Sequence, residues 1–158
     1  MKTTLLNRRS AKKLIYWRNI MNYETRDTYG MYNNEHHSGP GPRLMGADTL
    51  NGNDVYNAEN EDLGDIKEIM LDVASGKVAY AVLSFGGVFG LGEKLFAVPW
   101  KALKLDTENK RFILNVSKDR LSNAPGFDKD DWPDMTDRTW ADGVENFYDN
   151  DAYDKRQH

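Results

Sequence analysis

Hydrophobic and polar positions alternate over several short runs in the middle of the chain, and turn-forming residues separate the runs. The runs predict strands at 54–58, 65–73, 78–85, 95–100, 102–105 and 111–116. Short strands at this spacing are typical of an all-β barrel or sandwich. The run 78–85 is almost entirely apolar, as expected for a strand that crosses the centre of a small barrel.

The predicted strand 65–73 carries a break in its alternation. Ile66 is out of phase with the later apolar positions, which predicts a β-bulge near Lys67. Gly64 and Gly76 lie in the turns on either side, where we expect a positive φ. Beyond the bulge, one face of the strand carries three apolar side chains, Ile69, Leu71 and Val73.

The segment after the last strand changes from strand-like to helical. Ser117 is placed to cap a helical turn, and residues 124–135 have no period. Thr136 or Asp137 could cap a final helix over 137–148. One face of this helix would carry Trp140, Val144, Phe147 and Tyr148. We expect that face to pack on the barrel; the alternative is a free helix that binds a partner.

The two ends of the chain have opposite charge, although the formal net charge is only −4. Residues 1–21 hold six bases and no acid, whereas residues 128–154 hold ten acids and two bases. Residues 19–42 have no period and end in a GPGP breaker, and together with the basic start they predict a disordered leader over 1–42. We predict a barrel over 43–122, an extension over 123–150 and a tail over 151–158. An alternative is that translation starts at Met21, which would remove the basic part of the leader.

Several function classes are excluded by composition. The chain has no cysteine, so disulfides, thiolate zinc sites and a cysteine nucleophile are ruled out. It has no apolar run close to the roughly 20 residues that span a bilayer, so we expect a cytoplasmic protein without a membrane span. All three histidines lie in the predicted leader and tail, at His36, His37 and His158. The predicted barrel therefore offers no imidazole base, and paired histidines without a third ligand do not indicate a metal site.

The glycine-rich stretch 84–100 resembles a phosphate-binding loop but lacks its essential parts. Gly87 and Gly92 have the Walker separation, yet Lys94 comes one position late and no serine or threonine follows it. The next segment is strand-like and contains Pro99, whereas a phosphate loop requires a helix N-terminus. We therefore predict no nucleotide cofactor and no small-molecule substrate.

Acidic residues are abundant but form no recognisable site. In the predicted barrel they lie in turns or on polar strand faces, and no pair is held in an apolar pocket that would separate two pKa values. The stretch that begins at Asp128 resembles a calcium loop, but Trp132 and Pro133 occupy positions that need a ligand and a glycine. We therefore predict no catalytic residue and no metal.

The order of several segments carries a resemblance to a known family. These segments are DVYN at 54–57, DLGDIKEIMLD at 62–72, SGKVAYAVLSF at 75–85, GGVFGLGEKLFAVPW at 86–100 and FILNV at 112–116. Together they resemble the PRC-barrel family, and the APGFD and WPD that follow resemble the C-terminal extension of its stand-alone bacterial members. The resemblance implies a small, six-stranded, partly open β-barrel with a short helical extension.

The resemblance also implies a role. The same barrel forms the cytoplasmic domain of the photosynthetic reaction-centre H subunit and the C-terminal domain of the bacterial ribosome maturation factor. In both it is a docking module without catalytic residues. Since this sequence shows neither the transmembrane helix of the first nor the N-terminal domain of the second, we expect neither a photosynthetic role nor one in ribosome assembly.

We therefore predict a non-catalytic module that binds another protein or a second copy of itself. Aromatic and proline residues outside the strands are the candidates for an interaction surface, at Phe89, Phe127, Trp132 and Pro133. Such aromatics can also serve as lids over the barrel ends. An alternative function is an RNA- or ribosome-associated factor, in which the basic leader contacts phosphates and Tyr16 and Trp17 stack on bases.

Overall fold

The computed structural model describes residues 26–32, 41–85 and 94–154, and the chain divides into two compact units, Met1–Thr49 and Leu50–His158. The described part of the first unit includes a turn within the segment that the sequence predicts as a leader. There the Asp27 carboxylate accepts the backbone N–H groups of Met31 at 2.6 Å and Tyr32 at 3.3 Å. A short helix, α2 (Ala47–Leu50), follows this turn along the chain.

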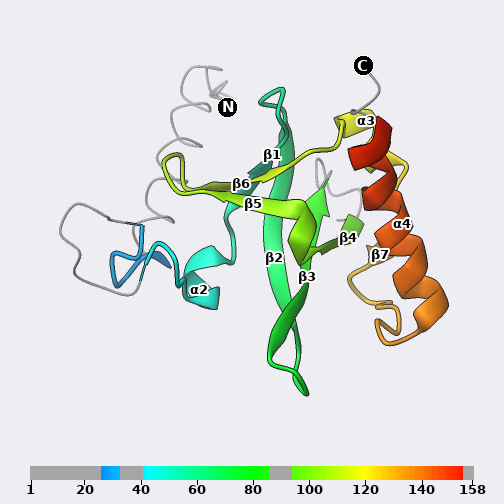
Figure 1. Ribbon diagram of the computed structural model, residues 1–158, viewed down its shortest axis with the longest axis horizontal. Coiled ribbons are helices and arrows are strands. Elements are labelled where there is room, and N and C mark those ends of the chain that lie inside the picture. The colour runs from blue at the N-terminus through cyan, green and yellow to red at the C-terminus, as the bar shows by residue number, and fades with distance from the viewer. Residues whose placement is uncertain (1–25, 33–40, 86–93, 155–158) are drawn as a thin grey trace, which may run out of the picture. The chain divides into compact units, whose positions relative to one another are not determined.

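The second unit is built on one sheet, which Figure 1 shows with α4 beside it. The strands are β1 (Asp54–Tyr56), β2 (Asp62–Asp72), β3 (Lys77–Phe85), β4 (Lys94–Pro99), β5 (Leu103–Asp106), β6 (Arg111–Leu114) and β7 (Phe127–Asp128). Their order is β5-β6-β1-β2-β3-β4-β7, with β1 and β6 parallel and all other neighbours antiparallel. Among the described residues the end strands β5 and β7 do not pair with each other. The predicted all-β, partly open barrel is confirmed.

The predicted number of strands was six, and the sheet has seven within the described residues. The additional strand, β7, lies in the segment 124–135 that was predicted to be irregular. It is only two residues long and has no pattern of its own. It exists because Phe127 pairs with Leu95 and Asp128 pairs with Lys94 on the edge of β4.

The pairing of β2 with β3 confirms the predicted bulge. Ile66 lies opposite Leu83 and Glu68 lies opposite Val82, so Lys67 is the extra residue. Since directly opposed side chains share a face, the bulge brings Ile69 back to the face of Ile66. The positive φ expected at two glycines is also confirmed, at +114° for Gly64 and +74° for Gly76. The turn predicted to end at Gly64 is wrong in its bounds, because β2 begins at Asp62 and Gly64 pairs with Val55 of β1.

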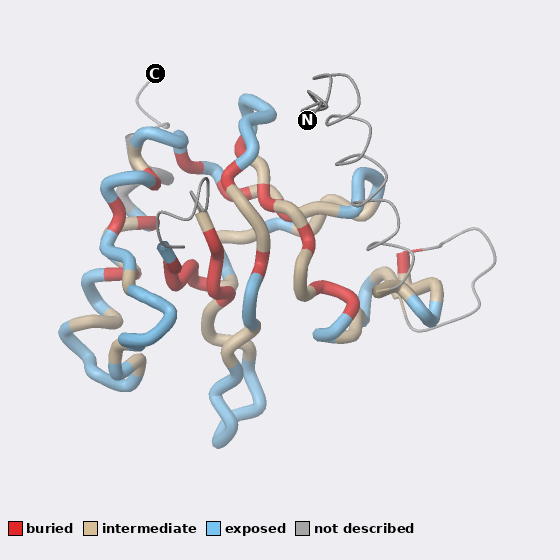
Figure 2. The backbone as a smooth tube through the Cα atoms, turned by 180° about the vertical axis from the view of Figure 1, so that it is seen from behind, coloured by how far each residue is buried: buried red, intermediate tan, exposed pale blue. Residues whose placement is uncertain are grey.

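The core is formed by side chains of the central strands, where buried residues are concentrated (Figure 2). Phe96 and Val98 of β4 are opposite Leu83 and Ala81 of β3, and all four are fully buried. The expected inward positions of the last strand are confirmed by burial of Phe112, Leu114 and Val116. These apolar side chains supply the hydrophobic stabilisation of the sheet.

The C-terminal segment closes one side of the sheet. A 3₁₀ turn, η1 (Trp100–Ala102), follows β4, and α3 (Lys118–Ser122) begins where Ser117 Oγ accepts the N–H of Arg120. The final helix, α4 (Arg138–Asp154), begins after Asp137, whose carboxylate accepts the N–H of Trp140. Helix α4 runs beside β4 (Figure 1) and extends past the predicted end at 148.

The apolar face of α4 is the one predicted from the sequence. Val144 and Tyr148 are buried, and Trp140 and Phe147 are half-buried. The Trp140 ring meets the Tyr80 ring of β3 edge-on, with a centroid distance of 5.5 Å. The stripe therefore packs on the sheet in this structure.

Candidate interaction surfaces

The predicted interaction residues come together in part. Phe127 and Trp132 are in contact, with ring centroids 5.1 Å apart and ring planes inclined by 58°. The Trp132 side chain is 42% exposed, whereas Phe127 and the adjacent Pro133 are half-buried. Phe89 lies outside the described residues. We call the group Phe127, Trp132 and Pro133 the Trp132 surface.

A tight turn brings Trp132 back against Phe127. Pairing with β4 fixes Phe127, and the next residue, Asp128, organises the turn. The Asp128 carboxylate accepts the N–H of Asp130 at 2.9 Å, and its carbonyl accepts the N–H of Asp131 at 3.1 Å. Trp132 Nε1 then donates to the carbonyl of Lys129 at 2.9 Å. These local hydrogen bonds hold the turn and set the orientation of the indole.

The surroundings of Trp132 are acidic. Exposed carboxylates precede and follow it at Asp128, Asp130, Asp131 and Asp134, and Lys129 is the one base between residues 124 and 137. Hydrogen bonds from the hydroxyl and N–H of Thr136 lower the pKa of Asp134, which keeps this carboxylate charged. Such a surface attracts cationic groups and repels polyanions.

A second exposed apolar surface lies at the far end of the β2–β3 hairpin. We call residues 67–79 the hairpin ribbon. Beyond Ile66 and before Tyr80, β2 and β3 pair only with each other among the described residues, and Figure 2 shows this end as exposed. Leu71 is 56% exposed and Val73 is 93% exposed. The sequence predicted that both lie on one face of a strand ending at residue 73, but β2 ends at Asp72 and Val73 lies in the turn that the bond from Gly76 N–H to the Asp72 carbonyl closes.

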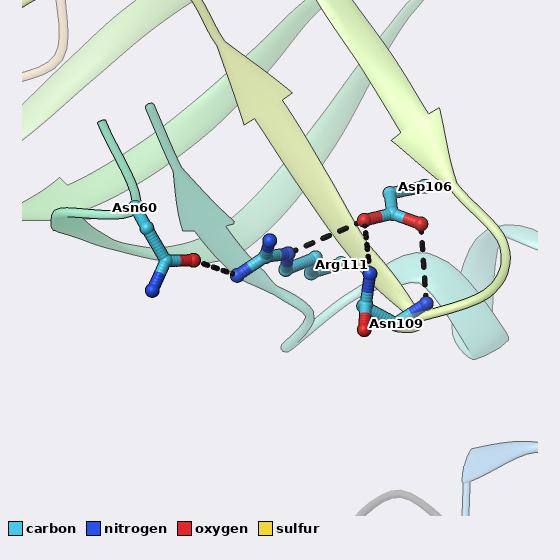
Figure 3. A network of polar contacts seen from close by, with 4 residues as sticks. All are labelled: Asn60, Asp106, Asn109 and Arg111. Atoms are coloured by element: carbon cyan, nitrogen blue, oxygen red, sulfur yellow. Dashed lines mark hydrogen bonds and ion pairs between the residues drawn. The ribbon is translucent and has the colours of Figure 1, made fainter. Parts of the chain in front are cut away.

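A polar network joins two turns at the opposite edge of the sheet (Figure 3). The Arg111 guanidinium donates to Asn60 Oδ1 at 2.7 Å and to Asp106 Oδ2 at 3.4 Å, and lies 4.6 Å above the Tyr56 ring. Asn109 donates to both oxygens of Asp106, and these bonds are the main reason that the pKa of Asp106 is lowered. The network holds the β5–β6 turn against the turn after β1, a stabilising role.

The titratable groups with shifted pKa do not form an acid–base pair. Hydrogen bonds lower the pKa of three carboxylates, those of Asp72, Asp106 and Asp134. A general acid at neutral pH requires the opposite shift. Burial raises the pKa of the Tyr56 and Tyr80 hydroxyls, so both stay protonated.

Neither a metal-binding cluster nor a membrane-spanning helix is found in residues 26–32, 41–85 and 94–154. No group of three or more acidic, histidine or cysteine side chains is close enough to hold a metal ion in the part of the chain that the structure describes. No helix in that part has the length and apolar character needed to cross a membrane.

Comparison with known proteins gives one clear match. The family model described as PRC-barrel domain matches residues 42–121, half of the chain. This range contains β1 to β6, while β7, the Trp132 surface and α4 follow it. No curated protein matches the chain.

Proposed function

Because the chain belongs to the PRC-barrel domain family, we propose that it is a non-catalytic module that binds other proteins. The observation that carries the proposal is the exposed indole of Trp132, held against Phe127 in a surface outside the family match. Trp is among the residues most enriched at the energetic centres of protein interfaces. Among the described residues, the three carboxylates with a shifted pKa all have it lowered, and none forms an acid–base pair. This supports a role that needs no catalysis.

The geometry of the Trp132 surface suits binding. The hydrogen bond from Trp132 Nε1 to Lys129 and the contact with Phe127 fix the ring before a partner arrives. A pre-oriented side chain loses little conformational entropy on binding, so more of the contact energy appears as affinity. The remaining exposed part of the ring can be covered by an apolar or cationic side chain.

The charge around the ring indicates the chemistry of the partner. Four exposed aspartates lie within four positions of Trp132 along the chain, and one lysine offsets their charge in part. A protein segment with Lys or Arg beside an apolar residue would gain electrostatic attraction and a cation–π contact with the indole. Nucleic acid would be repelled from this surface.

The test is the effect of Trp132→Ala on affinity-purified partners. We expect a partner retained by the wild-type protein to be lost, and its purified form to bind the variant at least about tenfold more weakly by calorimetry. Tyr29→Ala is the matched control, because Tyr29 is an exposed aromatic residue (74%) in the other unit. Circular dichroism checks that both variants fold. Unchanged partners and affinity for Trp132→Ala would contradict the proposal.

A further inference from the structure

The position of Trp132 depends on a tight turn that leaves the edge of the sheet at β7. Asp128 is the last residue of β7, and pairing with Lys94 of β4 fixes its backbone. The chain then reverses, because the Asp128 carbonyl accepts the N–H of Asp131 at 3.1 Å and these two residues form an antiparallel bridge. Trp132 follows this bridge directly, so the course of the turn decides where its ring lies.

One peptide group in the turn connects Asp128 to the indole. The Asp128 carboxylate accepts the N–H of Asp130 at 2.9 Å, and the Lys129 carbonyl accepts the Nε1–H of Trp132 at 2.9 Å. This N–H and this carbonyl belong to the same trans peptide bond, so they point in opposite directions and can only turn together, as one plane. A carboxylate that fixes the N–H therefore also aims the carbonyl at the indole.

The other contact of the indole is less directional. The Phe127 ring lies 5.1 Å from the Trp132 ring between centroids, with the planes inclined by 58°. Apolar contact is roughly proportional to buried area and tolerates rotation of a ring, whereas a hydrogen bond weakens steeply when it is bent. The bond to the Lys129 carbonyl is therefore the contact that selects one orientation of the indole.

The residue type at position 128 suits this role. Aspartate and asparagine favour the first position of a tight turn, because their short side chain places an oxygen beside the N–H two positions later. The bond needs the oxygen and not the charge, so the amide oxygen of an asparagine is an equivalent acceptor. Glutamate carries the same charge on a side chain that is one methylene longer, and it is not among the residues that favour this position.

We propose that Asp128 is a positioning residue for the Trp132 surface. Through the peptide group between Lys129 and Asp130, its carboxylate holds the indole in the orientation that a partner meets, and its charge is not required for this. The inference rests on the proposed function and names the residue that prepares that surface for binding.

Solvent exchange of the Trp132 indole N–H, measured by NMR on the ¹⁵N-labelled full chain, tests the positioning. The signal is assigned by its absence from Trp132→Phe. We expect Asp128→Ala and Asp128→Glu each to raise the exchange rate about two- to tenfold, which corresponds to one hydrogen bond. Asp128→Asn is expected to keep the wild-type rate. Asp130→Asn is the charge-matched control, because Asp130 takes part in the turn through its backbone N–H. An unchanged rate in Asp128→Glu, or a rate in Asp128→Asn as high as in Asp128→Ala, would overturn the proposal.

Calorimetry with a blocked hexapeptide of alternating arginine and leucine tests the consequence for binding, since this probe has the chemistry proposed for the partner. Asp128→Asn and Asp130→Asn remove the same charge, and we expect equal affinities for the peptide. Asp128→Glu keeps the charge and is expected to bind about two- to tenfold more weakly than wild type. Equal affinity of Asp128→Glu and wild type would overturn the proposal. A peptide that binds Trp132→Ala as well as wild type, or binds neither, would count against the proposed function, and the exchange rate would still decide the role of Asp128.

Discussion

Gly64 is the position where one added methyl group should matter most. It lies in β2, pairs with Val55 of β1 and has φ of +114°. A Cβ atom at this position would lie 1.8 Å from the carbonyl oxygen and 2.9 Å from the carbonyl carbon of Ser84. Both atoms belong to the β3 backbone, which cannot move away without breaking the sheet.

The expected cost of Gly64→Ala has two parts. An L-residue held in this sparsely populated region costs about 1–3 kcal/mol. Forcing a methyl group into filled space costs about 1–3 kcal/mol more. We therefore expect a loss of about 2–6 kcal/mol in the free energy of unfolding, a large part of the 5–15 kcal/mol that is typical of folded domains, as an order of magnitude.

Urea unfolding followed by tryptophan fluorescence measures this loss, because the half-buried Trp100 ring contacts the buried Phe112 ring, with centroids 5.7 Å apart. Gly76→Ala is the matched control. Gly76 has a φ of +74° and nothing within 4 Å of an added Cβ. The only expected cost of this variant is that of holding an L-residue in the left-handed conformation, about 1–2 kcal/mol in the free energy of unfolding. If the two variants unfold at the same urea concentration, the close approach of β2 to β3 at Gly64 adds no cost to the free energy of unfolding.

Three further outcomes can be checked in the same way. Gly143→Ala should raise the free energy of unfolding by about 0.5–1 kcal/mol, since Gly143 lies inside α4 with open space around it. Ser117→Ala should lower it by about 0.5–2 kcal/mol through loss of the cap on the Arg120 N–H, while Ser117→Asp should retain the cap. The lowered pKa of Asp106 means that its ionised form stabilises the fold above the unfolded pKa of about 3.9, and this stability is lost as the pH falls through the folded pKa. Asp106→Asn should therefore be less stable than wild type at pH 7 and should lose less stability on acidification, with Asn109→Ala giving a similar profile in urea titrations at several pH values.

Local features of the sheet were predictable because they depend on neighbouring residues. The phase break at Ile66 predicted the bulge, and the glycines at 64 and 76 predicted positive φ at these positions, although Gly64 lies in β2 and not in the predicted turn. The first strand was predicted to reach residue 58 but ends at Tyr56. Asn57 ends it, because its backbone and side chain bond to Glu61 and close a turn.

Features that depend on distant residues were not predictable. Alternation predicted that Leu71 and Val73 share a strand face, but the strand ends at Asp72 and Val73 lies in the turn that follows. The exposure of Leu71 depends on where β1 stops pairing with β2, which no local pattern signals. The Arg111 contact with Asn60 joins residues 51 positions apart, and no local pattern signals it. Phe127 and Trp132 were both predicted as interaction residues, but their contact was not predictable. It depends on the turn at Asp128, and the sequence around this turn has no hydrophobic period.

The parallel pairing of β1 with β6 has a consequence for the order of folding. Val55 meets Phe112 across this pairing, and Asn57 Nδ2 donates to the carbonyl of Val116, 59 positions away. The strands β2, β3 and β4 pair with sequence neighbours and lose less loop entropy on closing. We expect this three-stranded meander to form early and the junction of β1 with β6 to form last, which sets a slow rate for the whole barrel. Amide hydrogens at that junction should exchange with solvent through opening reactions of lower free energy than those in the centre of β3.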